Sequence, residues 1–159
     1  MTRALDRVWA PWRRRYQTAP KPRGCVFCRA LRSRQDRRHL VVQRGRHAFV
    51  MLNLYPYTNG HLLITPNRHV GRLERLTDAE RVELWRLAGE FTGRLDRALK
   101  PHGYNLGVNL GRAAGAGVLG HLHLHLVPRW TGDTNFITPV GNLRVISDSL
   151  DAVYRLLTS

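Results

Sequence analysis

The stretch that decides the fold is His121-Leu122-His123-Leu124-His125-Leu126-Val127. Leucine and histidine alternate here without a break, and in a β-strand alternate side chains point to opposite faces of the sheet. The sequence therefore predicts a strand whose leucines face a core and whose histidines line the other face. The two outer histidines would lie ~13 Å apart at their Cα atoms, at about 3.3 Å per residue. That separation is too large for both to bind one metal ion through bonds of ~2 Å.

Three aligned imidazoles instead indicate chemistry, because a ring near neutral pH is both a nucleophile and a proton carrier. A glycine-rich segment, Gly111–Gly120, comes directly before them. Successive glycines let backbone N–H groups converge on an anion, so residues 111–117 of this segment predict a phosphate cradle. A flexible hairpin loop is the competing interpretation. Attack of a ring nitrogen on phosphorus would give a phosphoramidate intermediate, and the site would need an acid for the leaving group.

The rest of the chain predicts further strands and one long helix. The apolar runs that favour strands are residues 40–42, 48–52, 61–64 and 104–110. Thr77 and Glu80 form a capping box, and apolar residues then recur on one helical face until Pro101 ends the helix. Short helices are expected over residues 25–34 and 150–157. Strands, a long helix and strands again predict an α+β domain with an antiparallel sheet and helices on one face.

Length and composition exclude several classes of protein. The chain has 159 residues, 43% of them apolar, which suffices for one core and hardly for two domains. No apolar run approaches the roughly 18 to 20 residues that span a bilayer, and residues 1–15 lack the apolar segment of a secretory signal. Two cysteines cannot make a disulfide framework. We therefore expect a cytoplasmic protein without a membrane partner or an organic cofactor.

Positive charge is concentrated in the first third of the chain. Residues 1–50 carry 14 Lys and Arg against 2 Asp and Glu, a net charge of +12, whereas residues 51–159 carry 12 against 9, a net +3. Such an excess indicates an anionic partner, which could be nucleic acid, a membrane surface or a phosphorylated small molecule. An arginine-rich composition with solvated side chains is the alternative. Residues 1–24 form a basic arm containing tryptophan and proline, and residues 25–159 form the single domain.

Cys25 and Cys28 have the two-residue spacing of a zinc knuckle. Two ligands do not complete such a site, because a closed zinc site has four. Redox chemistry and two free thiols are the competing interpretations, although nothing around the pair resembles a thioredoxin βαβ unit.

The alternating histidines resemble the motif of the histidine triad (HIT) superfamily, His-φ-His-φ-His-φ-φ with φ apolar. The similarity covers about residues 25–136. Its other matching stretches are residues 52–57, 60–66, 105–109 and 128–130, together with His69. Trp9-Ala10-Pro11-Trp12 and the stretch 128–136 are most similar to bacterial diadenosine tetraphosphate (Ap4A) phosphorylases and their relatives.

This resemblance implies a homodimer, with a five-stranded antiparallel sheet and one long and one short helix in each subunit. It implies attack by His123 on the α-phosphate of an adenine nucleotide, which forms a nucleotidyl-histidine. His125 and His121 would hold phosphate oxygens and orient the nucleophile, with His61 beside them. Because the nucleotidyltransferase branch has Gln as its third residue, His125 favours a hydrolase or a phosphorylase, the latter with inorganic phosphate as second substrate.

The resemblance also implies which residues bind the nucleotide and which bind a metal ion. The nucleotide ligands are Asn53 for the ribose, Phe27 and Leu54 for the base, Asn109 and the Gly117 amide for the phosphates, and Trp130 for the other subunit's substrate. A structural zinc ion would be held by Cys25, Cys28, His69 and His121.

Three functions are therefore carried forward. The first is cleavage of dinucleoside polyphosphates through His123. The second stays within enzymes and is hydrolysis of nucleoside phosphoramidates, or removal of adenylate from DNA ends. The third is binding of nucleic acid through the basic arm without catalysis.

Overall fold

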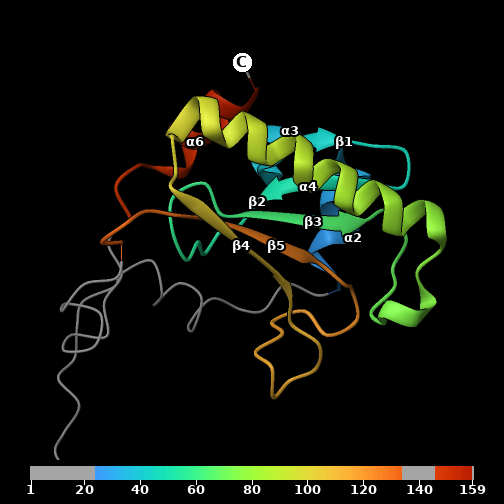
Figure 1. Cartoon of the computed structure of the whole chain (residues 1–159). Coiled ribbons are helices and arrows are strands. Elements are labelled where there is room, and N and C mark those ends of the chain that lie inside the picture. The colour runs from blue at the N-terminus through green and yellow to red at the C-terminus, as the bar shows by residue number, and fades with distance from the viewer. Residues whose placement is uncertain (1–23, 134–145, 159) are drawn as a thin grey trace, which may run out of the picture.

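The computed structural model describes residues 24–133 and 146–158 (Figure 1). The expectations for the arm before residue 24 and for the stretch 134–136 therefore lie outside the described residues. In chain order the elements are α2 (Val26–Ser33), α3 (Asp36–His39), β1 (Val41–Arg44), β2 (Ala48–Leu52), β3 (Leu62–Pro66), the 3₁₀-helix η1 (Leu73–Arg75), α4 (Asp78–Leu99), β4 (Gly103–Val108), β5 (Leu124–Arg129) and α6 (Leu150–Thr158).

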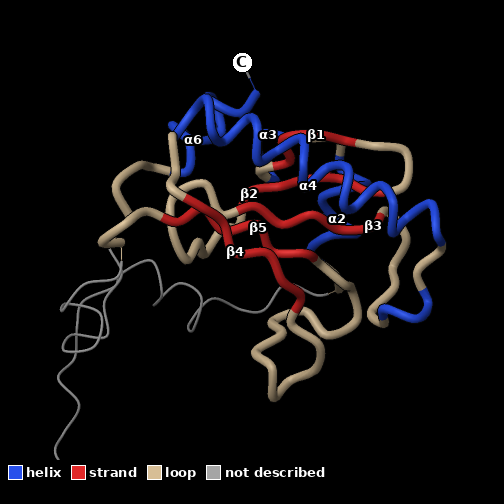
Figure 2. The backbone as a smooth tube through the Cα atoms, viewed as in Figure 1, coloured by secondary structure: helices blue, strands red, loops and turns tan. Residues whose placement is uncertain are grey.

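The five strands form one antiparallel sheet in the order β1-β2-β3-β5-β4, which confirms the predicted α+β fold (Figure 2). The strand β5, which carries His125, thus runs between β3 and β4. His125 pairs with Leu63 on β3 and with Gly107 on β4. The last histidine is therefore fixed by backbone pairing on both sides.

The long helix α4 covers one face of the sheet, as Figure 1 shows. Its capping box is confirmed, because Thr77 accepts from the Glu80 N–H while the Glu80 carboxylate accepts from the Thr77 N–H. Its apolar face packs on β2, β3 and β5 through fully buried residues such as Leu87, Phe91 and Leu95, and α6 packs beside it. No helix in the described ranges is both long and apolar enough to cross a membrane.

The expectation that the helices share one face is wrong for α2. Phe27 and Ala30 of this helix pack with Val41, Phe49 and Leu63, whose side chains leave the sheet on the side away from α4. Residues 25–34 and 150–157 form the two short helices that the sequence predicts, and α3 is an addition to them. The sheet is therefore covered on both faces, and α2 lies over the histidine face.

Two strands depart from what their alternating patterns predict. The triad begins before β5, since the strand starts at Leu124 and leaves His121 and His123 in the segment that leads into it. In β4, Tyr104 and Val108 pack against the core as expected, but Leu106 is 40% exposed. The reason is that β4 is an edge strand, and α4 packs mainly over its neighbours.

Candidate functional site

The three triad histidines lie together and are buried. His121 is 0%, His123 6% and His125 9% exposed. The helix α2 contributes to this burial, because the Phe27 ring lies 5.1 Å from the rings of both His121 and His123, centroid to centroid. The triad rings thus sit in a low-dielectric setting, which favours the neutral form of imidazole.

Hydrogen bonding decides which nitrogen of His123 carries the proton. Its Nδ1 lies 2.9 Å from the backbone carbonyl oxygen of His121. A carbonyl only accepts, so Nδ1 carries the hydrogen and Nε2 of the neutral ring carries the lone pair. Burial lowers the pKa of His123 below its ordinary value, although the bond to the His121 carbonyl opposes that shift. His123 is therefore a neutral ring with a nucleophilic Nε2.

A chain of hydrogen bonds sets the opposite tautomer in His125. The Tyr57 N–H donates to Nδ1 of His61 at 3.0 Å, so the proton of His61 is on Nε2. That Nε2–H donates to Nδ1 of His125 at 2.9 Å, so His125 carries its proton on Nε2. Burial, and then the positive charge that His123 carries when it is protonated, lower the pKa of His125 to about 4. A lone pair on His123 thus stands beside an N–H donor on His125, with ring centroids 5.0 Å apart.

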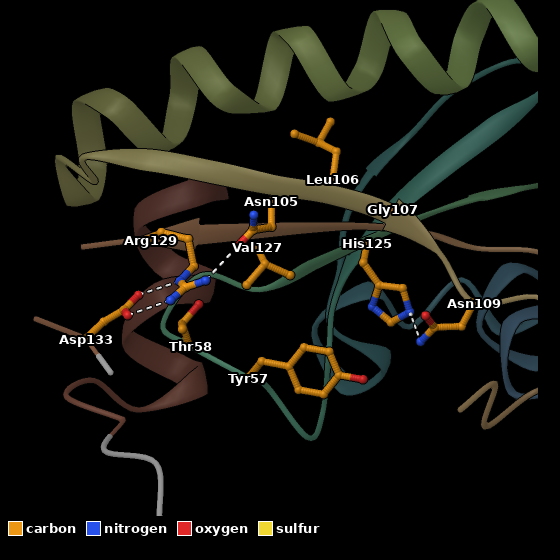
Figure 3. Close-up of a pocket in the computed structure, with 10 residues that line it drawn as sticks. All are labelled: Tyr57, Thr58, Asn105, Leu106, Gly107, Asn109, His125, Val127, Arg129 and Asp133. Carbon is orange, nitrogen blue, oxygen red and sulfur yellow. Dashed lines mark hydrogen bonds and ion pairs between the residues drawn. The ribbon is translucent and has the colours of Figure 1, made fainter. Parts of the chain in front are cut away.

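A cavity of about 350 Å³ opens beside His125 (Figure 3). The Tyr57 ring stacks on His125 at one wall, with 5.8 Å between centroids, and β4 forms the opposite wall through Asn105 and Gly107. The Asn109 side-chain nitrogen lies 3.5 Å from Nε2 of His125. Both atoms are donors in this tautomer, so one acceptor between them would satisfy both, and an anionic oxygen is suited to that place.

Cys25, Cys28, His69 and His121 are brought together as a candidate metal centre. Each offers one ligand atom, and these atoms all lie within 4.8 Å of one another. Nδ1 of His121 lies 3.2 Å from Sγ of Cys25, 3.5 Å from Sγ of Cys28 and 3.3 Å from Nδ1 of His69. A tetrahedron with bonds of about 2.0 Å to nitrogen and 2.3 Å to sulfur has edges of about 3.3 to 3.8 Å. The four residues therefore fit a metal ion.

His121 belongs to this centre rather than to the cavity. Its Nε2 donates to the Pro66 carbonyl at 2.8 Å, which leaves the lone pair on Nδ1, toward the two sulfur atoms. Both ring nitrogens are thus engaged. This geometry favours metal binding by His121 over the contact with phosphate oxygens that the resemblance implies.

The residues that the resemblance assigns to nucleotide binding differ in how firmly they are held and how exposed they are. Asn53 is held in place, since its Oδ1 accepts from the Tyr55 N–H and its Nδ2 lies 3.2 Å from Nδ1 of His61. Leu54 is 55% exposed, whereas Phe27 is 2% exposed and supports the histidine rings. Gly117 lies exposed in the β4–β5 loop, and Trp130 is half-buried just after β5. Their nucleotide contacts stay predictions.

Sequence reasoning missed Tyr57 and the Pro66 carbonyl. Tyr57 acts through its backbone N–H and its stacked ring, and Pro66 acts through its carbonyl oxygen. Every residue has a backbone, so the backbone contacts of Tyr57 and Pro66 have no signature in residue type. The stretch 52–57 belonged to the family resemblance, and that position was the one available sign.

Comparisons with known proteins show the family of this chain. The profile of the HIT domain matches residues 34–132. An AP-4-A phosphorylase from Mycobacterium tuberculosis is 40% identical over 163 residues, which cover 98% of this chain and 84% of that protein. The chain belongs to the HIT family. These findings make this HIT protein a nucleotide-processing enzyme, as the buried triad predicts.

Solved structures share the fold of this HIT protein. A zinc-bound histidine triad family protein from Mycobacterium smegmatis superposes with a TM-score of 0.67 and 24% identity, over 85% of this chain and 91% of that one. A hypothetical histidine triad nucleotide-binding protein from Sulfolobus tokodaii gives a TM-score of 0.65 and 25% identity, over 84% and 89% of the two chains. The sheet and helices described above are thus those of the HIT fold.

Proposed function

We propose that this protein cleaves dinucleoside polyphosphates such as Ap4A at the α-phosphate, through a nucleotidyl-histidine on His123. The observation that carries the proposal is the pair of opposite tautomers, with a lone pair on Nε2 of His123 and a proton on Nε2 of His125. The relative with 40% identity over almost the whole chain is an AP-4-A phosphorylase, which supports the same reaction.

In the first step, Nε2 of His123 attacks the α-phosphorus and forms a P–N bond while the P–O bond to the remaining polyphosphate breaks. With Ap4A the leaving group is ATP, which departs with the bonding electron pair. Nε2–H of His125 and the amide of Asn109 donate to the phosphate oxygens, whose negative charge they stabilise. Because neither donor has to reorient, this stabilisation is already in place when the charge develops.

In the second step, an acceptor breaks the P–N bond and frees His123. Inorganic phosphate as acceptor gives ADP, so the phosphorylase reaction yields ATP and ADP. Water as acceptor gives AMP instead, so a hydrolase yields ATP and AMP. Because the relative is a phosphorylase, we propose phosphate as the acceptor.

We propose zinc as the ion at the four-residue centre, because two thiolates and two imidazoles are a donor set that zinc prefers. When bound, the ion would supply a fixed charge and a cross-link, with no part in the chemical steps. His121 would be the shared element, since its ring faces the metal centre and its carbonyl holds His123. The centre would thereby anchor α2 to the catalytic segment.

We also propose that the protein is a homodimer. Among the described strands β4 pairs with β5 alone and is an edge strand, and the apolar side chain of Leu106 on it is 40% exposed. A second copy that paired along this edge would cover both, and Trp130 of each subunit would then be near the partner. Light scattering coupled to gel filtration tests this proposal, and a strictly monomeric mass at micromolar concentration would contradict it.

The experiment that tests the reaction is product analysis of Ap4A incubated with the protein, with and without inorganic phosphate. ATP plus ADP formed only with phosphate is the expected result. ATP plus AMP in both samples would make the protein a hydrolase. No turnover of Ap4A would redirect the search to nucleoside phosphoramidates, adenylated DNA or salt-dependent binding of nucleic acid without catalysis.

His123→Asn is the matching variant. It should bind nucleotide with affinity close to that of the natural protein and have no measurable turnover, because the amide keeps a polar group but cannot form the P–N bond. Turnover by this variant at a rate near that of the natural protein would show that the nucleophile is another residue.

A further inference from the structure

A buried hydroxyl on β3 contacts the segment that carries the nucleophile. The β3–β5 ladder runs from Leu62–Leu126 to Ile64–Leu124 and ends there, before His123. Thr65 is the next residue on β3 and is 0% exposed. Its Oγ1 donates to the backbone carbonyl of Leu122 at 2.8 Å. This side chain therefore continues the connection between the two strands where the ladder has stopped.

The need for this bond follows from the sequence of β3. Continuing the register would place Pro66 opposite Leu122, and proline has no N–H to donate. Leu122 is only 4% exposed, so its carbonyl is closed off from most water. A buried carbonyl without a donor is costly, and the Thr65 hydroxyl supplies the donor that Pro66 lacks.

The carbonyl of Leu122 has a direct link to the nucleophile. It belongs to the peptide group whose nitrogen is that of His123, so its direction sets the plane from which the His123 side chain departs. The Leu122 N–H is held separately by the Val70 carbonyl at 2.7 Å, and the His121 ring is held by the Pro66 carbonyl. Thr65 thus holds the one peptide group between these anchors and β5.

We propose that Thr65 is a positioning residue for the nucleophile, which acts by fixing the Leu122–His123 peptide and through it the bond between His123 Nδ1 and the His121 carbonyl. Its hydroxyl does not touch substrate. The inference rests on the proposed function of His123, and it adds a residue that neither the triad motif nor the metal centre includes.

The test is a pair of variants that separate the hydroxyl from the shape of the side chain. Thr65→Val keeps the β-branched shape and removes the donor, whereas Thr65→Ser keeps the donor. We expect Thr65→Val to lower kcat by about tenfold, the effect of about one hydrogen bond, with KM changed by less than about threefold. Thr65→Ser should restore kcat to within about threefold of the natural protein.

A control variant accounts for the general cost of losing a hydroxyl. Thr92 in α4 also donates to a backbone carbonyl, that of Gly89, but lies on the helix away from the site. Thr92→Val should leave kcat and KM unchanged. Thermal unfolding of all variants should show them fully folded at the assay temperature, so that a loss of kcat cannot come from an unfolded fraction.

A second readout needs no turnover and separates this inference from the proposed function. The ¹⁵N chemical shifts of the His123 ring report which nitrogen is protonated, and they should show the Nδ1–H tautomer in the natural protein and in Thr65→Ser. In Thr65→Val we expect a mixture of tautomers. If the natural protein cleaves none of the nucleotides tested, the proposed function fails while these shifts still decide the role of Thr65.

Two results would overturn the inference. One is a Thr65→Val variant with natural kcat and natural ¹⁵N shifts. The other is equal loss of kcat in Thr65→Val and Thr65→Ser, which would assign Thr65 to packing alone.

Discussion

Replacement of His61 tests the chain of hydrogen bonds that sets the tautomer of His125. His61 is 0% exposed, and its ring joins the Tyr57 N–H on one side to Nδ1 of His125 on the other. His61→Leu removes both contacts at similar volume, whereas His61→Gln keeps an acceptor and donors on one side chain. The pair therefore separates hydrogen bonding from packing.

The magnitude follows from what His61→Leu leaves unpaired. The buried Nδ1 of His125 and the part-buried N–H of Tyr57 would each lose this partner, at about 1 to 3 kcal/mol apiece, so the free energy of unfolding should fall by about 2 to 6 kcal/mol. His125 would also be free to carry its proton on Nδ1, which withdraws the donor from the phosphate. A loss of about 2.7 kcal/mol in transition-state stabilisation lowers kcat about a hundredfold.

The assays are urea unfolding and chromatographic measurement of Ap4A cleavage in the presence of phosphate. His61→Gln should retain kcat within about tenfold, because its amide can accept from Tyr57 and donate to His125. The reasoning is refuted if folded His61→Leu cleaves Ap4A at the natural rate. Equal losses in both variants would show that the ring shape of His61 matters and its hydrogen bonds do not.

Four further predictions follow from the same structure. The acid limb of the kcat/KM profile should have its midpoint below pH 6.5, because burial lowers the pKa of His123 and only the neutral ring has the nucleophilic lone pair; a midpoint at or above 6.5 would contradict this. Elemental analysis should find about one zinc ion per chain, and Cys28→Ser should abolish it and lower the melting temperature. Burial raises the pKa of Glu83, but bonds from three backbone N–H groups outweigh it and lower the pKa below 4.5. The ionised Glu83 carboxylate therefore contributes to the free energy of unfolding above about pH 4.5, and this contribution is lost as the pH falls through the lowered pKa. In urea titrations at pH 7, Glu83→Gln should be less stable than the natural protein by about 1 to 3 kcal/mol, and this difference should shrink in acid. Phe91→Ala, which empties the centre of the core, should lower the free energy of unfolding by about 3 to 5 kcal/mol, and a loss below about 1 kcal/mol would place Phe91 outside the core.

Most of the architecture could be predicted from the sequence because it depends on local patterns. The capping box at Thr77 and the apolar face after it predict α4, and both are confirmed. The pattern failed at the histidines themselves, where alternation predicted a strand from His121 but β5 starts at Leu124. Alternation reports to which side each side chain points, whereas a strand also needs backbone partners, and Pro66 has no N–H to donate at that point.

The sequence by itself determined which residues are candidates for the chemistry. Three spaced histidines, the cysteine pair and the capping box each depend on residue type and spacing, which a linear chain displays fully. Only the tertiary structure decided which nitrogen of each ring carries the proton. That choice depends on backbone groups of Tyr57, Pro66 and His121, and on burial under α2. Backbone groups are the same in every residue, so their roles arise only when folding brings distant segments within hydrogen-bonding distance.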